Sequence, residues 1–184
     1  MNNIYVGQLV SSNYLEHHGI LGMKWGVRRY QNPDGSLTEV GKRRYAREQK
    51  KALKRYKKES ITVQKEQLRN YSHLYVNAYN KTADEYNNGK IEEYNKKHKV
   101  TDKDYDSAME EQFSRDFKRN LNREVMDFTL NSPAYKRGEA LANKYKLWEI
   151  DELARKNKQF VDEMLASDYT LDVNEFEKRA SRKS

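Results

Sequence analysis

Apolar residues recur every three or four positions along most of the chain, which is the spacing of one face of an α-helix. The clearest stripe consists of Tyr105, Met109, Phe113, Phe117, Leu121, Val125 and Phe128. This pattern predicts a mainly α protein with three or four long amphipathic helices.

The longest helix is expected to start after Thr38, a suitable N-cap, and to end at Asn87-Asn88-Gly89. Its apolar positions are Tyr45, Ala52, Tyr56 and Val63, followed by Leu68, Tyr71, Tyr75, Ala78 and Tyr79. The β-branched run Ile61-Thr62-Val63 marks a point where we expect this helix to bend or break.

Further helices follow toward the C-terminus. A short helical piece is expected over residues 91–98, and Asn131-Ser132-Pro133 should end one helix and start the next. Apolar residues between Leu141 and Met164 extend that next helix to about Ser167, and a last short helix should begin near Asp172.

The N-terminal part has a different composition, because six of the eight glycines lie in the first 41 residues. Asn32-Pro33-Asp34-Gly35 is a strong turn signal, and it predicts a small β-hairpin over residues 27–38. We therefore expect an irregular glycine-rich head or tag (1–38), a long helix that is first basic and then tyrosine-rich (39–88), and a helical domain with a basic tail (89–184).

Composition excludes several classes of protein. The 184 residues include no cysteine, so disulfide scaffolds, thiolate metal sites and cysteine nucleophiles are ruled out. No apolar run is long enough for a membrane span, and the first ten residues lack the features of a secretory signal. We expect a soluble protein of the cell interior without a membrane partner.

The net charge of +8 is concentrated in one stretch, the basic segment, residues 41–60. Its ten cationic residues are Lys42, Arg43, Arg44, Arg47, Lys50, Lys51, Lys54, Arg55, Lys57 and Lys58. A charge run is often just a solvated helix face, but here only Glu48 and Glu59 accompany ten cations, so most of the cations have no acidic partner at i,i+4 spacing. It is therefore expected to bind DNA, RNA or an acidic protein surface.

Residues 14–45, YLEHHGILGMKWGVRRYQNPDGSLTEVGKRRY, resemble a short tag found in phage and prophage proteins of Gram-positive bacteria. The matching residues are His18, Gly19, Gly22, Met23, Lys24, Trp25, Gly26, Val27, Arg28, Arg29, Tyr30, Gln31, Asn32, Asp34, Gly35, Ser36, Leu37, Thr38, Gly41, Arg44 and Tyr45. The resemblance implies a virion-associated or head-assembly protein, located in the host cytoplasm and incorporated in the virion. It also implies that the tag docks a capsid or head protein through His18, Gly19, Gly22, Lys24, Trp25, Gly26, Arg28, Arg29 and Tyr30.

Enzymatic chemistry is the weaker interpretation of the same segment. His17 and His18 lie near Lys24, Arg28 and Arg29, as a nuclease would need, but only Glu16 is close enough in sequence to orient either ring. No spacing of His, Asp and Glu matches a metal site. We expect no catalytic residues, no metal and no cofactor.

Two further alternatives concern binding. The series Tyr71, Tyr75, Tyr79 and Tyr86 could stack on bases, although packing between helices is the more common role of such rings. A phage inhibitor that binds a host nuclease or another host defence protein would also use a basic helix. Because the long helix has more polar than apolar circumference, part of it is expected to be buried in a homodimer or complex.

Overall fold

The computed structural model describes residues 30–32, 34–98 and 105–182, and these residues are mainly α-helical, as predicted. The elements are α2 (Glu39–Glu85), η1 (Tyr86–Lys90), α3 (Ile91–Lys97), α4 (Tyr105–Asn131), α5 (Pro133–Tyr145), η2 (Leu147–Glu149), α6 (Glu152–Ala166) and α7 (Val173–Arg182). The chain divides into two units, residues 1–48 and residues 49–184, which are described separately.

In the first unit, a tight turn leads into α2. Gly35 has φ +84°, and its N–H donates to the carbonyl of Asn32 at 3.0 Å. Thr38 acts as the N-cap, because its hydroxyl oxygen accepts the N–H of Gly41 at 3.1 Å. Within the described residues the predicted hairpin is reduced to one antiparallel bridge between Gln31 and Leu37.

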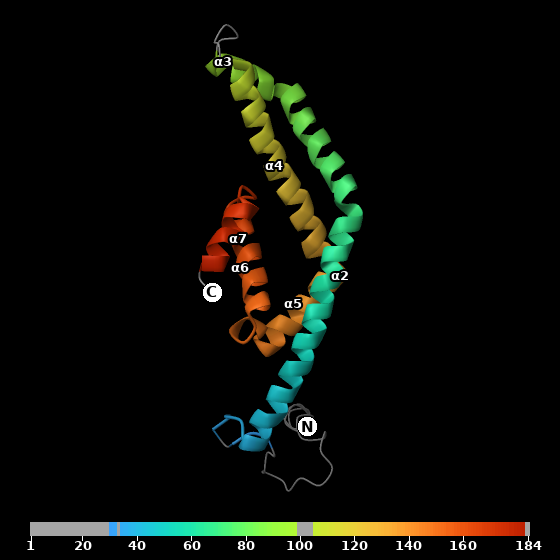
Figure 1. Ribbon diagram of the computed structural model, residues 1–184, viewed down its shortest axis with the longest axis vertical. Helices are drawn as coiled ribbons and strands as arrows, with labels where there is room; N and C mark the ends of the chain where they lie inside the picture. Colours follow the sequence, from blue (N-terminus) through green and yellow to red (C-terminus); the bar gives the residue numbers. More distant parts are fainter. Residues whose placement is uncertain (1–29, 33, 99–104, 183–184) are drawn as a thin grey trace, which may run out of the picture. The chain divides into compact units, whose positions relative to one another are not determined.

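α2 does not break at residues 61–63, because it stays helical through them, although its path curves along its length (Figure 1). The hydroxyl of Thr62 donates to the carbonyl of Lys58 at 3.0 Å, so this β-branched residue is accommodated within the helix. The predicted end is confirmed: Gly89 has φ +136°, a conformation that only glycine adopts readily, and the helix path kinks there.

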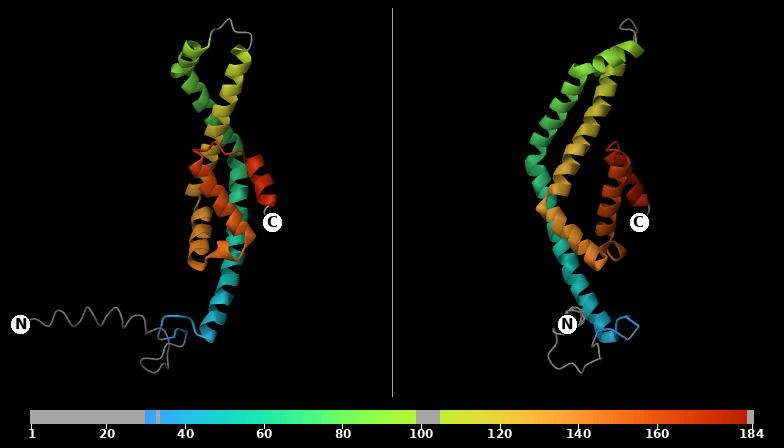
Figure 2. Two further views of the ribbon diagram at one scale, coloured as in Figure 1. Left: turned by 90° about the vertical axis from the view of Figure 1, so that its left-hand side faces the viewer. Right: turned by 180° about the vertical axis from the view of Figure 1, so that it is seen from behind.

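In the second unit, α4 runs back along the later part of α2, and the two helices lie side by side (Figures 1 and 2). Aromatic rings fill the space between them. The ring centroids of Tyr75 and Phe117 are 4.9 Å apart, and those of Tyr86 and Phe113 are 5.0 Å apart. Tyr75, Tyr79 and Tyr86 of the tyrosine series thus pack against α4, whereas the ring contact of Tyr71 is with Tyr75 of the same helix.

The single helix predicted from residue 133 to about 167 is wrong, because the chain turns between α5 and α6. Lys146 adopts φ 49°, which ends α5. The Asp151 carboxylate then accepts the N–H of Ala154 at 3.2 Å and starts α6. The predicted start at Ser132-Pro133 is confirmed, since the Ser132 hydroxyl oxygen accepts the N–H of Ala134.

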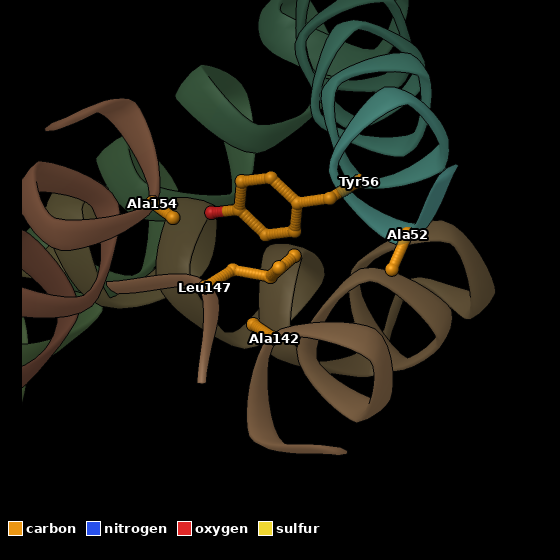
Figure 3. Close-up of a cluster of buried hydrophobic side chains, with 5 residues drawn as sticks. All are labelled: Ala52, Tyr56, Ala142, Leu147 and Ala154. Carbon is orange, nitrogen blue, oxygen red and sulfur yellow. The ribbon is translucent and has the colours of Figure 1, made fainter. Parts of the chain in front are cut away.

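A small apolar cluster joins α2 to α5, η2 and α6. The ring of Tyr56 lies over Leu147, Ala142 lies on the other side of Leu147, and Ala154 lies near the Tyr56 hydroxyl (Figure 3). Leu147 is fully buried, and the Tyr56 hydroxyl accepts a hydrogen bond from Asn157 at 3.0 Å. This cluster fixes which face of α2 points inward in the second unit.

The last helix, α7, starts where predicted. The carboxylate of Asp172 accepts the N–H groups of Asn174 and Glu175 and so caps the helix. Phe176 of α7 packs edge-on against Phe160 of α6, with centroids 5.2 Å apart. This contact holds α7 against α6 (Figure 2).

Candidate nucleic-acid interface

The first unit contains the start of the basic segment, and the side chains of Arg43 and Arg47 are exposed there. Within the described residues neither forms an ion pair, whereas Lys42 pairs with Glu39 at 2.8 Å. The guanidinium of Arg44 lies 4.8 Å from the centroid of the Tyr30 ring. Arg43 and Arg47 are therefore available to an anionic partner.

The second unit contains the rest of the basic segment. Lys50, Lys54, Arg55 and Lys58 are exposed and form no ion pair with any residue that the structure describes. Lys51 is also exposed. Lys57 forms a 2.8 Å ion pair with Asp151, the N-cap residue of α6. Four cations thus lie along one stretch of helix, and no described carboxylate forms an ion pair with any of them.

Packing explains why these cations point to solvent. Ala52 and Tyr56 of α2 are buried in the apolar cluster, and they fix the opposite helix face outward. Residues four apart are neighbours on a helix, so Lys50, Lys54 and Lys58 form one row of charges. The row spans about 12 Å of the helix axis.

The acidic residues of this part of α2 do not relieve the repulsion along the row. Glu59 accepts a hydrogen bond from Arg137 of α5 at 2.9 Å, and Glu66 accepts one from Ser132 at 2.7 Å. Both carboxylates are therefore turned toward neighbouring helices. A row of uncompensated ammonium and guanidinium groups attracts phosphates, and binding would release counterions from a nucleic acid.

Most residues of the predicted docking tag lie outside the described residues: His18, Gly19, Gly22, Lys24, Trp25, Gly26, Arg28 and Arg29. His17, which the nuclease interpretation also requires, lies outside them as well. Tyr30 is described: its carbonyl accepts the N–H of Thr38 at 3.0 Å. A Cβ at Gly41 would collide with that same carbonyl oxygen. Gly41 is therefore required by the close approach of the turn to α2.

A hollow of about 790 Å³ lies within the second unit, lined by residues of α2, α4, α5, α6 and α7. Apolar side chains such as Val63, Met126, Met164 and Phe176 form much of its wall. Burial, with the nearby charge of Glu139, raises the pKa of Tyr135 to about 12. Its hydroxyl therefore stays protonated at neutral pH.

Sequence reasoning missed a polar cluster at the kinked end of the α2–α4 pair. Lys90 donates to Glu85 at 2.7 Å and to Asp116 at 3.1 Å, and the Tyr86 hydroxyl donates to the same Asp116 oxygen. Burial alone would lower the pKa of Lys90, but these hydrogen bonds outweigh it and raise the pKa. Asn88-Gly89 was the available signal, since the kink brings Lys90 back toward α4.

Replacing Lys90 by Met is expected to lower the free energy of unfolding by about 1 kcal/mol at pH 7, because Glu85 and Asp116 lose their shared cation. Burial would raise the pKa of Glu85, but its contact with Lys90 lowers it overall. A lowered folded-state pKa stabilises above the unfolded value of about 4.3, and this stabilisation is lost as pH falls further. The difference between the two proteins should therefore shrink below pH 4 in urea unfolding experiments.

Lys97→Met is the matched control, because Lys97 pairs with Glu93 at 3.0 Å on an exposed surface. We expect this substitution to cost less than about 0.5 kcal/mol. An equal cost for both variants at pH 7, or a Lys90→Met effect that persists at pH 3.5, would contradict the assignment.

Two general features concern the part of the chain that the structure describes. None of its helices combines the length and the apolar character that crossing a membrane requires. Over the same residues, no three His, Asp or Glu side chains gather closely enough to hold a metal ion.

Comparison with known proteins gives one match. Residues 10–32 match the model of a family of unknown function, DUF7211. No curated protein and no solved structure matches the chain. The matched residues overlap the first half of the tag at 14–45, so the N-terminal segment is similar to a family whose function is open.

Proposed function

We propose that this protein is a non-enzymatic accessory protein of phage head assembly that binds nucleic acid through the basic segment. In this proposal the N-terminal tag docks a capsid or head protein, and the protein enters the virion from the host cytoplasm. The observation that carries the nucleic-acid part is the row of exposed cations at Lys50, Lys54 and Lys58, with Arg55 beside it. None of these four forms an ion pair with a residue that the structure describes.

The chemistry of this row favours binding to the phosphate backbone. Lysine ammonium groups act as point charges and lack the planar fork that reads a guanine edge. Phosphate contacts position a protein on nucleic acid without selecting a sequence. The proposed binding is therefore independent of sequence and strongly dependent on salt.

Fluorescence anisotropy with two labelled 20-base-pair DNA duplexes of unrelated sequence tests the proposal. We expect equal affinities for the two duplexes. A plot of log K against log salt should have a slope of about −3.6, because each of the four cations Lys50, Lys54, Arg55 and Lys58 would make one phosphate contact. A slope near zero, or absence of binding at 50 mM salt, would refute the nucleic-acid part.

Trp25→Ala separates the two halves of the proposal. Trp25 lies in the tag and outside the basic segment, so this variant should bind DNA with unchanged affinity. It should no longer co-purify with phage heads. Retention of the variant in heads would remove the docking part and leave the nucleic-acid part standing.

A further inference from the structure

Beyond the basic segment, α2 exposes a row of apolar side chains. Ile61, Leu68 and Tyr75 recur every seven residues and Tyr79 follows four residues later, which is the spacing of one seam position of a coiled coil, with Lys65 and Ser72 at the intervening seam positions. Leu68 has an exposed fraction of 77%, and Ile61 has one of 52%. Single exposed apolar residues are ordinary, but a row at heptad spacing is the signature of a helix-binding face.

This row is distinct from the buried face of the same helix. Val63, Leu74 and Ala78 are buried, whereas Leu68 was expected from the sequence to lie with them. Tyr75 and Tyr79 each place one ring edge against Phe117 of α4. They remain 43% and 49% exposed, so α4 covers each of these rings only in part.

Positive charge flanks the row. Lys58, Lys65 and Arg69 are exposed, and across the part of the chain that the structure describes none of them forms an ion pair. The two acidic residues between positions 57 and 80, Glu59 and Glu66, are engaged with Arg137 and Ser132. The outer face of this stretch is therefore apolar along its middle and cationic beside it.

We propose that this face, the outer seam (Ile61, Leu68, Tyr75, Tyr79, Lys58, Lys65 and Arg69), binds an acidic amphipathic helix of another protein. Such a helix would place apolar residues at heptad spacing on the row and Asp or Glu beside the three cations. Charge complementarity decides the occupant. A second copy of the chain would bring the same cations together, and a nucleic acid would leave Leu68 without an apolar partner.

A synthetic four-heptad peptide tests this with the full-length chain. The acidic peptide has Leu at the a and d positions and Glu at e and g, and its matched partner has Lys at e and g. Isothermal titration calorimetry should detect binding of the acidic peptide to the protein and no binding of the basic peptide. The double variant Ile61→Ser and Leu68→Ser should bind the acidic peptide about tenfold more weakly or worse.

Charge reversal gives a second readout. Lys65→Glu together with Arg69→Glu should shift the preference toward the basic peptide, since specificity follows the sign of the flanking charges. These residues are exposed, so circular dichroism should show unchanged helix content. Leu165→Ser, at an exposed position of α6, should leave the peptide affinity unchanged.

Three results would overturn the proposal. One is equal affinity for an acidic peptide with Ala in place of Leu, which would mean attraction by charge alone. Another is a dimer in sedimentation equilibrium that Leu68→Ser dissociates. The third is a loss of DNA affinity in the Ile61→Ser and Leu68→Ser variant as large as the loss of peptide affinity. The first two results leave the salt-dependent DNA binding proposed for the basic segment untouched, whereas the third would assign the outer seam to the same DNA-binding surface.

Discussion

Replacing Leu147 by Ala is expected to lower the free energy of unfolding by about 3 kcal/mol. Leu147 is fully buried beneath the Tyr56 ring, in the cluster where α2 meets η2, α5 and α6. Truncation removes buried methyl groups and leaves a cavity that Ala142 and Ala154 are too small to fill. Urea unfolding followed by far-UV circular dichroism measures the loss, which should also lower Tm by roughly 6 to 12 °C.

Leu153→Ala is the matched control for this substitution. Leu153 lies six residues further along, at the start of α6, and is 40% exposed. Its truncation should cost less than about 1 kcal/mol, because much of the side chain is already in water. Equal losses for the two variants would show that the Leu147 cluster does not hold the second unit together.

The helices themselves could be predicted from the sequence because apolar spacing, N-caps and glycines agree with one another there. The turn between α5 and α6 could not, since the apolar repeat from Leu141 to Met164 continues across it without a glycine or proline. What ends α5 is the left-handed conformation of Lys146, and the chain turns there as the next residue, Leu147, enters the apolar cluster. That is a tertiary effect, and local propensity does not report it.

The basic segment was evident from the charge count alone, but the count does not show which of its cations form ion pairs. Sequence spacing does not reveal that Glu59 and Glu66 face other helices, or that Lys57 is tied to Asp151. It also placed Leu68 on the buried face, because both faces of α2 carry apolar residues at helical spacing. Only packing against α4 and α5 distinguishes the two faces.

The C-terminal residues of the tag, which the structure describes, have a structural role in the turn before α2. The carboxylate of Asp34 accepts hydrogen bonds from the hydroxyl and the N–H of Ser36, and these hydrogen bonds lower the pKa of Asp34. Gly35, Thr38 and Gly41 then shape the turn into α2. These residues serve local folding, so the docking role proposed for the tag rests on the residues before Gln31.

Neutralising the row of free cations is expected to weaken binding to a DNA duplex by about a thousandfold at 0.1 M salt. The variant carries the four substitutions Lys50→Gln, Lys54→Gln, Arg55→Gln and Lys58→Gln. Each lost phosphate contact should reduce the steepness of log K against log salt by about 0.9, so most of the salt dependence disappears. Fluorescence anisotropy over 50 to 200 mM salt measures both the affinity and the slope.

The matched control removes the same number of charges from other helices. Its substitutions are Lys96→Gln, Lys118→Gln, Lys136→Gln and Arg155→Gln, all at exposed positions. Because isolated surface charges more than about 8 to 10 Å from the bound phosphates are screened, this variant should lose less than about tenfold in affinity. If the two variants lost affinity equally, binding would follow net charge, and the row on α2 would have no special part in it. If only the first loses affinity, the +8 of the whole chain acts through one exposed helix face.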